Sequence, residues 1–242
     1  MTRAVIMAGG EGTRLRPFTH SIPKPLLPIG RKPIAQIIVE RLRDCGIPRI
    51  TMAVNYGADL IRAYFGNGSQ FGVQIDYFHE PRKLGTAGAL AHIGDLGAEP
   101  FLVTNGDILT ALDYGAFLAG HAASDAAMTV ATRRDTMTIP YGVLRLGDDG
   151  AITGVTEKPR TDYTFSAGVY ALSPAALAHI PRDRAFDMTD LINALPAAGL
   201  GVRAHPLDAL WFDLANVDDF EKALAELERL DPAFYRDVTH HS

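Results

Sequence analysis

A short apolar run that ends in glycines is the feature that most constrains how this chain can fold. Residues 4–8 read Ala-Val-Ile-Met-Ala, and Gly9, Gly10 and Gly12 follow directly. An apolar run of this length, bounded by glycines, is typical of a parallel strand that is buried on both faces. Ligands of open parallel sheets bind beyond the carboxyl ends of the strands. The pattern therefore predicts an α/β fold with a binding site just after residue 8.

The rest of the first half alternates between helix and strand patterns. Prolines recur through residues 11–33 and exclude a long helix or a central strand there, so this segment is expected to be a functional loop. Strands are predicted over residues 50–54, 73–77 and 101–104, and helices over residues 34–45, 57–65 and 86–96. This alternation predicts a Rossmann-like, mostly parallel sheet flanked by helices.

The second half has a more mixed pattern. Strands are predicted over residues 128–133, 142–146, 152–156 and 166–172, with a strong turn signal at 147–150, and helices over residues 174–179, 187–197 and 217–230. The sequence contains neither a repeat nor a low-complexity linker. We therefore expect a single domain over residues 1–242 that carries a smaller, mixed, substrate-facing lobe.

Charge and composition exclude several classes of protein. The chain has 23 Lys and Arg against 28 Asp and Glu, a net charge of −5, which argues against a nucleic-acid partner. No apolar run reaches the roughly 18 residues of a membrane span, and the first apolar run is too short for a signal peptide. The lone Cys45 cannot form an internal disulfide. We expect a soluble cytoplasmic protein that contacts no membrane.

The glycine-rich segment after the first strand is suited to phosphate. Its backbone N–H groups can approach phosphate oxygens, and Arg14, Arg16 and Lys24 follow it with fixed positive charge. Leu15 stands where a dinucleotide-binding fingerprint would need its third glycine, which argues against a nicotinamide-dependent oxidoreductase. Spacing alone leaves a second interpretation open, a structural turn beside solvated basic residues.

The order of residues around these glycines resembles a known family. Gly-Gly-x-Gly-Thr-Arg-Leu-Arg-Pro-x-Thr, from Gly9, followed by Pro-Lys-Pro-Leu-Leu-Pro, is similar to the signature of the sugar-1-phosphate nucleotidylyltransferases. The resemblance continues through residues 65–72, 84–89, 105–107, 157–159 and 211–213 and covers roughly residues 3–225. It implies an enzyme of nucleotide-sugar biosynthesis, with cell-surface polysaccharide as one expected destination of its product.

The resemblance also implies roles for particular residues. Arg14 and Lys24 would act in catalysis on the phosphates. The nucleotide would contact Ala8, Gly9, Gly10, Gly12, Thr13, Arg14, Gly85, Thr86 and Asn105. The sugar phosphate would contact Gly142, Glu157, Lys158, Ser166 and Gly168. Residues 1–110 would then form mainly the nucleotide-binding half, and residues 111–230 mainly the sugar-phosphate-binding half.

Two aspartates are candidate ligands for Mg²⁺, the expected cofactor. Asp107 follows the predicted strand 101–104, and Asp213 follows Trp211-Phe212 at what reads as another strand end. Two carboxylates together with triphosphate oxygens suit Mg²⁺, although either aspartate alone is more often a cap or turn residue. The resemblance assigns both positions to metal binding.

Glu157 and Lys158 also have a second interpretation, because a lone Glu-Lys pair is usually a solvated surface pair.

The sequence departs from the family pattern at two positions and leaves several alternatives open. Ser166 stands where the family often has Asn, and Ala215 where it usually has Gly. His79 and Glu80 are expected near the base or sugar pocket, with a structural role favoured over a binding one. Small residues at 85–88 favour a purine, so GTP is expected over UTP or dTTP. A non-catalytic nucleotide-sugar sensor is the alternative from another class. No C-terminal β-helix is expected, and the oligomeric state stays open, a homo-oligomer included.

Overall fold

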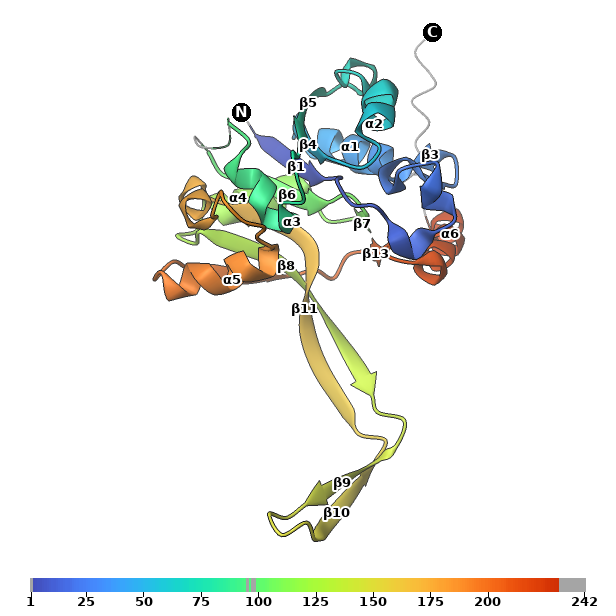
Figure 1. The fold of residues 1–242 in the computed structure, drawn as a ribbon, viewed down its shortest axis with the longest axis vertical. Helices are drawn as coiled ribbons and strands as arrows, with labels where there is room; N and C mark the ends of the chain where they lie inside the picture. The colour runs from blue at the N-terminus through green and yellow to red at the C-terminus, as the bar shows by residue number, and fades with distance from the viewer. Residues whose placement is uncertain (1, 95, 97–98, 231–242) are drawn as a thin grey trace.

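The computed structural model describes residues 2–94, 96 and 99–230, and a seven-stranded sheet lies at its centre (Figure 1). From one edge to the other its strands are β12 (Val202–Pro206), β8 (Met128–Thr138), β11 (Arg160–Leu172), β6 (Phe101–Asn105), β1 (Arg3–Met7), β4 (Arg49–Val54) and β5 (Gln74–His79). β11 is antiparallel to both of its neighbours, and the other adjacent pairs are parallel. The prediction of a mostly parallel sheet is confirmed.

Helices cover both faces of this sheet. On one face lie α1 (Ile34–Asp44), α2 (Ala58–Phe65) and α4 (Tyr114–Ala122), and on the other lie α3 (Gly85–Gly88) and α5 (Met188–Ala197). β1 shows why its sequence is apolar throughout: Ala4 and Ile6 pack into the first hydrophobic cluster, while Val5 packs into the second. A strand covered on both sides needs apolar side chains at every position.

The structure differs from the sequence analysis in three segments, one predicted helix that is shorter and two elements that were not predicted. The helix expected over residues 86–96 is only α3 followed by a 3-10 turn at Ala89–Ala91. α4 and β12 were assigned no element. The sequence analysis did not predict α4 because it contains Gly115, and glycine has a low helix propensity. The structure requires glycine at this position, because a Cβ there would lie 2.6 Å from the Cys45 carbonyl oxygen.

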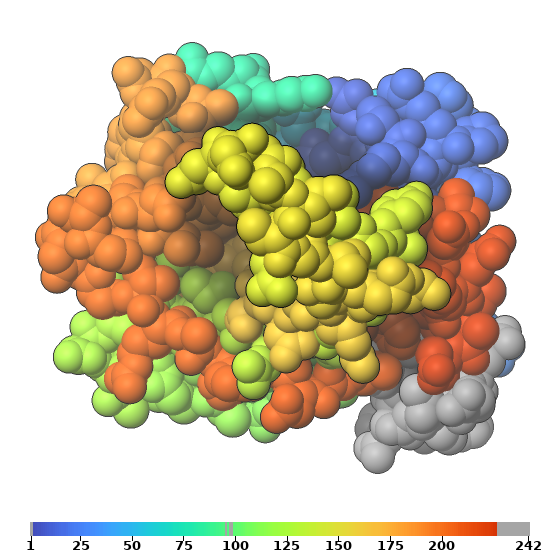
Figure 2. Space-filling view, turned by 90° about the horizontal axis from the view of Figure 1, so that it is seen from below, coloured from blue at the N-terminus to red at the C-terminus, as the bar shows by residue number. Residues whose placement is uncertain are grey.

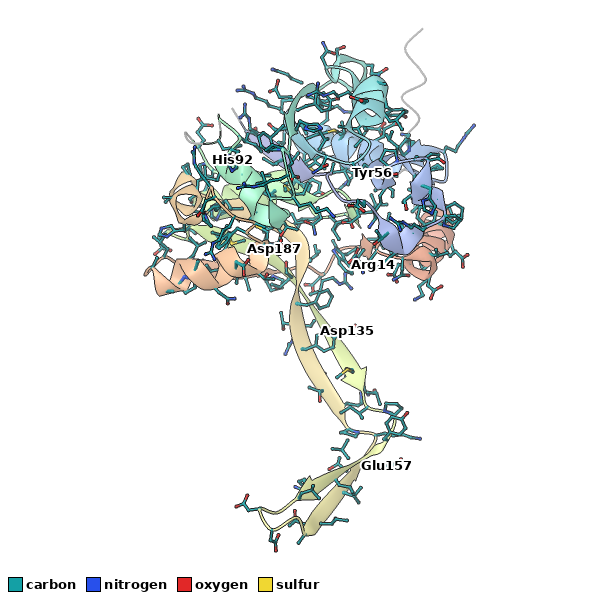
Figure 3. The ribbon with its side chains drawn as sticks, in the orientation of Figure 1. Arg14, Tyr56, His92, Asp135, Glu157 and Asp187 are labelled. Atoms are coloured by element: carbon teal, nitrogen blue, oxygen red, sulfur yellow. The ribbon has the colours of Figure 1, made fainter. Side chains whose placement is uncertain are left out.

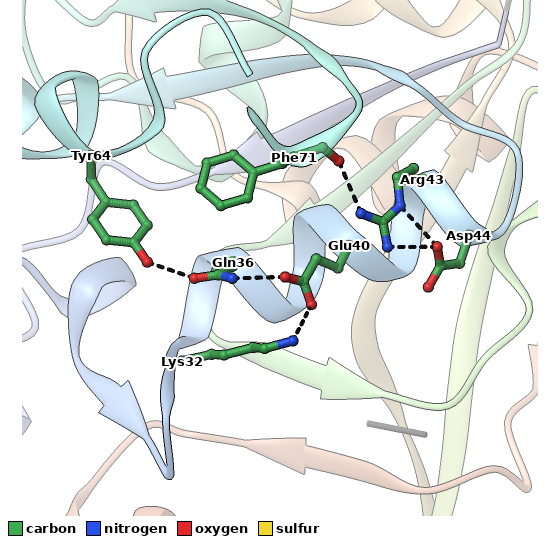
Figure 4. Close-up of polar contacts among 7 residues, drawn as sticks. All are labelled: Lys32, Gln36, Glu40, Arg43, Asp44, Tyr64 and Phe71. Atoms are coloured by element: carbon green, nitrogen blue, oxygen red, sulfur yellow. Dashed lines mark hydrogen bonds and ion pairs between the residues drawn. The ribbon is translucent and has the colours of Figure 1, made fainter. Parts of the chain in front are cut away.

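The proline-rich segment is a loop of 3-10 turns that closes on a small hairpin. The turns span Thr13–Leu15, Phe18–His20 and Lys24–Leu26, and the hairpin pairs β2 (Pro28–Ile29) with β3 (Lys32–Pro33). Figure 4 shows how its end is fixed: Lys32 Nζ lies 2.9 Å from Glu40 Oε2 of α1, and both side chains are buried. The loop that follows the glycines is therefore attached to the core.

β8 and β11 continue beyond the sheet as a two-stranded ribbon. The ribbon ends in a hairpin of β9 (Gly142–Leu146) and β10 (Ile152–Glu157), far from the rest of the molecule (Figure 1). We call residues 133–165 the arm and the remaining described residues the body. Viewed end-on, the tip of the arm stands in front of the body (Figure 2). This arm, whose side chains are mostly exposed, occupies the place of the expected smaller lobe.

Two further elements complete the body. β13 (Trp211–Asp213) pairs antiparallel with β7 (Ile108–Thr110), and α6 (Val217–Leu230) follows it. The Trp211 indole N–H donates to the Ala167 carbonyl at 2.8 Å, which ties β13 to β11. Within residues 2–94, 96 and 99–230, no helix has both the length and the apolar character needed to cross a bilayer.

Candidate active site

A cleft of about 550 Å³ opens at the carboxyl ends of β1 and β6. It is lined by every residue that the sequence analysis assigns to the nucleotide: Ala8, Gly9, Gly10, Gly12, Thr13, Arg14, Gly85, Thr86 and Asn105. Lys24 and Asp107 line it as well. Its volume lies within the range of small-molecule sites, and its position beyond the strand ends is where open parallel sheets bind ligands.

The glycines allow other segments to approach the floor of the cleft. Gly12 has a φ of +61°, and a Cβ there would lie 2.8 Å from Cγ2 of Thr19. The Thr19 hydroxyl donates to the Gly12 carbonyl at 2.8 Å, so the proline-rich loop is fastened to the glycine-rich one. A Cβ at Gly9 would lie 2.7 Å from Oε1 of Glu80. Side chains at these positions would separate the segments that shape the cleft.

A lysine and an aspartate form an ion pair inside the cleft. Lys24 Nζ lies 2.5 Å from Asp107 Oδ2, and the lysine side chain is only 10% exposed. The two residues come from the proline-rich loop and from the turn after β6. The Lys24 ammonium can turn from the Asp107 carboxylate to a phosphate oxygen when a phosphate binds, because it forms charge-assisted hydrogen bonds with either group.

The pairing of β7 with β13 brings the second aspartate to the first. Asp213 lies opposite Ile108, and the Leu214 N–H donates to the Asp107 carbonyl at 3.1 Å. Partial burial raises the pKa of Asp213, and the neighbouring Asp107 carboxylate raises it further, while Lys24 and Arg14 oppose the shift. Two carboxylates from opposite halves of the sequence therefore lie close enough to influence each other's charge, although Asp107 lines the cleft and Asp213 lines a separate hollow beside β13.

This pair of carboxylates fits a magnesium ion. Asp213 adds a second carboxylate beside Asp107, whose charge Lys24 already partly balances, and two carboxylates together with phosphate oxygens would suit a divalent cation. In the described part of the chain, no three His, Cys, Asp or Glu side chains group closely enough to hold a metal by themselves. Mg²⁺ is commonly bound by one or two carboxylates, with substrate phosphates and water completing its coordination. Asp107 and Asp213 would be its protein ligands.

Thr86 lines the cleft, but its own polar groups are already engaged. Its N–H donates to Asp187 Oδ1 at 2.8 Å, and its hydroxyl accepts from the Met188 N–H at 2.8 Å. Asp187 also begins α5 with a reciprocal capping box formed with Asp190. These bonds hold the segment around Gly85 in place. The sequence analysis missed Asp187, for which the Asp-x-x-Asp spacing before an apolar helix was the available signal.

Glu80 lies in the cleft, near the base pocket where the sequence analysis places it, but not in a purely structural role. Its carboxylate lines the cleft although the residue is only 8% exposed, and its Oε2 accepts from the Leu84 N–H at 3.2 Å. Burial raises the pKa of this carboxyl. The hydrogen bond of Oε2 to the Leu84 N–H is a structural role, whereas the other oxygen, Oε1, lies beside Gly9 in the cleft wall. A carboxylate that accepts hydrogen bonds is thus built into the cleft wall.

The residues assigned to the sugar phosphate are divided between body and arm. Gly168, with a φ of +74°, lies at the base of β11, where a Cβ would be 2.9 Å from Asn105 Nδ2. Ser166 is nearby and its hydroxyl donates to the Tyr170 hydroxyl at 2.9 Å. Gly142, Glu157 and Lys158 instead lie at the arm's tip, and Figure 3 shows Glu157 far from Arg14.

Comparison with known proteins places the cleft in a family. The family described as nucleotidyl transferase matches residues 3–229. The UTP–glucose-1-phosphate uridylyltransferase of Synechocystis sp. is 34% identical over 92% of this chain and 62% of its own length. The mannose-1-phosphate guanylyltransferase of Mycobacterium tuberculosis is 32% identical over 93% of this chain and 64% of its own. This chain therefore spans less than two thirds of either relative.

A solved structure shares the fold. HddC from Yersinia pseudotuberculosis, in its complex with GMP-PN, superposes with a TM-score of 0.70 and is 28% identical. The alignment covers 94% of this chain and all of that one. The match therefore extends over both halves of the sequence.

Proposed function

We propose, on the premise that this chain belongs to the nucleotidyl transferase family, that it transfers a nucleotidyl group from a nucleoside triphosphate to a sugar 1-phosphate. The observation that supports this most strongly is the meeting of the glycine-rich loop, Lys24 and Asp107 at one cleft, with Asp213 close enough for the charge of Asp107 to raise its pKa. A site with this composition can hold a triphosphate and a divalent cation together. A non-catalytic nucleotide sensor would not need the basic residues and both carboxylates together.

The reaction is an in-line displacement at phosphorus. An oxygen of the sugar 1-phosphate attacks the α-phosphorus of the triphosphate, the bond from that phosphorus to the bridging oxygen breaks, and pyrophosphate leaves with the electron pair. Positioning and charge neutralisation supply most of the rate in such transfers. No general base is required, because a phosphate monoester is already ionised near pH 7.

The residues of the cleft divide these tasks. Arg14 would neutralise the triphosphate and the departing pyrophosphate, and Lys24 would stabilise charge near the α-phosphoryl group. Asp107 and Asp213 would hold Mg²⁺, which would supply positive charge to the phosphate oxygens. The glycine-rich loop would donate backbone N–H groups to them. We place the reaction in the cytoplasm, where nucleoside triphosphates are available.

Guanine is the base that the cleft favours. Glu80 presents a carboxylate, which only accepts hydrogen bonds when it is ionised. The Watson–Crick edge of guanine carries adjacent N–H donors at N1 and N2, whereas uracil and thymine carry one N–H between two carbonyl oxygens. A carboxylate therefore suits guanine and repels the carbonyl groups of the pyrimidines. We propose GTP as the preferred substrate, with a mannose-type sugar 1-phosphate as acceptor.

A substrate panel tests this proposal. GTP, UTP, dTTP and ATP would each be combined with mannose 1-phosphate and glucose 1-phosphate, and pyrophosphate release would be followed. We expect turnover that depends on Mg²⁺ and is fastest with GTP. Nucleotide binding without turnover across the panel would identify a sensor instead. Turnover led by UTP would leave the reaction class intact and remove the assignment of guanine.

Glu80→Gln tests the base assignment directly. An amide offers one donor and one acceptor, so the variant should lose kcat/KM with GTP by about 10-fold or more relative to UTP. Wild type and variant should also be compared as pH falls. The pKa of Glu80 is raised, so its carboxyl should protonate at a pH above the usual range for Glu, and the preference of wild type for GTP should weaken there. The preference of the variant should not change over the same range. An unchanged ratio of GTP to UTP would remove Glu80 from base recognition.

A further inference from the structure

The tip of the arm carries an aliphatic surface that its own chain leaves exposed. Leu144 and Leu146 of β9 are 51% and 63% exposed, and Ile152 and Val155 of β10 are 66% and 60% exposed. Leu146 pairs with Ile152 and Leu144 with Val155, and directly opposed residues of an antiparallel ladder share a face. All four side chains therefore lie on one face of the hairpin, which we call the tip patch.

Glu157 lies on the same face as the tip patch. It pairs with Gly142, which is two residues before Leu144 and so points to the same side of β9. A Cβ at Gly142 would lie 3.0 Å from Glu157 Oε2, so the carboxylate leans over that glycine. Any surface that covers the tip patch consequently also meets Glu157.

Lys158, the next residue, has an unusual backbone conformation. Its φ is +45°, and among the described residues other than glycine it is alone in having a positive φ. Such a conformation is disfavoured for residues other than glycine, and backbone strain of this kind concentrates at functional sites. The Lys158 N–H donates to the Tyr141 carbonyl at 3.2 Å, which fixes the residue at the junction of hairpin and ribbon. The strain marks a position whose side-chain direction matters.

The arm is built to hold these two residues away from the cleft of its own body. The ladder between β8 and β11 runs without interruption from the Thr138–Arg160 pair to the Thr132–Ser166 pair. Six residues of ribbon span about 20 Å at the usual strand rise. Figure 3 shows Glu157 at the far end of the arm and Arg14 in the body. In this structure the tip therefore lies far from the cleft of its own body.

The body also carries exposed apolar side chains, on the loop between the cleft residues Arg14 and Lys24 and on the helix packed against that loop. Phe18 and Ile22, both on the loop that follows Arg14, are 59% and 43% exposed, and Leu60 of α2 is 50% exposed. The Tyr56 hydroxyl donates to the Thr19 carbonyl at 2.9 Å, which holds this loop against the start of α2. We call Phe18, Ile22 and Leu60 the rim patch. Exposed apolar patches bordered by polar groups are typical of protein interfaces.

We propose that the arm of one copy seats its tip patch on the rim patch of a second copy and supplies Glu157 and Lys158 to the cleft of that copy. The inference rests on the proposed function, because it completes the same site. The arrangement is reciprocal, so a twofold dimer covers two tip patches and two rim patches and contains two complete sites. A two-stranded hairpin is only marginally stable alone in water, which gives the arm a reason to be covered.

The chemistry of the two residues suits the second substrate. The Lys158 ammonium neutralises the phosphate of the sugar 1-phosphate, and the Glu157 carboxylate accepts hydrogen bonds from sugar hydroxyls. The body of the partner holds the triphosphate. Each site thus combines a nucleotide subsite from one copy with a sugar-phosphate subsite from the other.

Complementation between two defective copies tests the inference. A body variant, Asp107→Asn, and an arm variant, Glu157→Ala with Lys158→Ala, would be co-expressed with different tags and purified through both tags. Exchange of arms leaves one intact site of two, so the mixed dimer should show about half of the wild-type activity. Arms that serve their own chain leave no intact site. The assay would use a limiting concentration of the sugar 1-phosphate that wild type prefers in the panel.

A matched control pairs two body variants, Arg14→Ala and Asp107→Asn, which should stay inactive in either arrangement. Light scattering gives a readout independent of activity: wild type should have twice the mass of the chain, and Leu146→Glu with Ile152→Glu should be monomeric with an unchanged circular dichroism spectrum. A mixed pair no more active than the sum of its parts, full activity of the arm variant, or a monomeric wild type would each overturn arm exchange. Wild type without turnover on the whole panel would instead count against the proposed function.

Discussion

β8 and β11 pass through two environments, and the contrast between their two ends separates the roles of body and arm. Within the sheet, residues 128–131 and 169–172 are buried and almost wholly apolar. In the arm, residues 134–138 and 160–164 pair in the same ladder but are largely exposed, and polar residues predominate. Backbone pairing can therefore continue where the core ends. The body fixes groups rigidly, whereas the arm carries groups to a distance.

The first prediction tests the rigidity of the body. Lys32→Met leaves the Glu40 carboxylate without its buried cation, and breaking such a pair costs about 3–5 kcal/mol in the free energy of unfolding. Urea denaturation would measure the loss. Adding Glu40→Leu should restore most of it, because an apolar pair of similar volume is often as stable as the ion pair.

The control for this first prediction lies in the arm. Asp162 accepts a hydrogen bond from the Thr136 hydroxyl at 2.7 Å in an exposed position, and Asp162→Ala should change stability by no more than about 0.5 kcal/mol. Comparable losses at Lys32 and Asp162 would show that body and arm do not differ as described.

The second prediction concerns the chemistry held by the body. Asp107→Asn and Asp213→Asn should each lower kcat by about 100-fold or more, since each removes a carboxylate from the expected metal site. Circular dichroism should show an unchanged fold. A variant with normal rate and normal dependence on Mg²⁺ would exclude that aspartate from metal binding.

The third prediction concerns the arm. Lys158→Ala should mainly raise KM for the sugar 1-phosphate, by about 10- to 150-fold, because a charge-assisted phosphate contact contributes roughly 1.5–3 kcal/mol. Arg14→Ala in the body should instead impair use of the triphosphate. If Lys158→Ala changed only the parameters of the triphosphate, the division of the site between arm and body would be wrong.

The fourth prediction is the smallest and depends on pH. The pKa of Asp213 is raised in the folded chain, so its contribution to stability is present at low pH and is lost as pH rises through that pKa. At neutral pH with a chelator, Asp213→Asn should therefore raise Tm, by about 1–3 °C. The gain should shrink as pH falls below the ordinary range of Asp. A lowered Tm at neutral pH, or a gain that does not vary with pH, would contradict this.

Much of the body could be predicted from the sequence because its signals are local. The run at residues 4–8, the glycines after it and the periodicity of α1 each report burial or backbone conformation directly. α4 was missed because Gly115 reads as a helix breaker, whereas a close approach to the Cys45 carbonyl demands it. A residue that serves a distant contact carries no local signal of it.

The position of the arm could not be predicted for a related reason. Alternation in residues 142–146 and 152–156 predicts paired strands, and they do pair, but pairing says nothing about where a hairpin points. The bulge between Ser166 and Tyr170 interrupts the ladder near the sheet, and Gly168 inside it is a local sign of a bulge that does not say which way the arm points. The direction in which the hairpin points is set by how β8 and β11 leave the sheet, which local sequence patterns do not report. The roles of Glu157 and Lys158 stay predictions that the experiments above decide.

The pairing of β7 with β13 also sets the order in which the site can be assembled during synthesis. Asp107 lies near the middle of the chain, but its partner strand, Trp211–Asp213, is made about a hundred residues later. A ribosome releases the glycine-rich loop, Lys24 and Asp107 long before the second carboxylate emerges. The growing chain can thus form most of a nucleotide pocket while lacking the paired carboxylates.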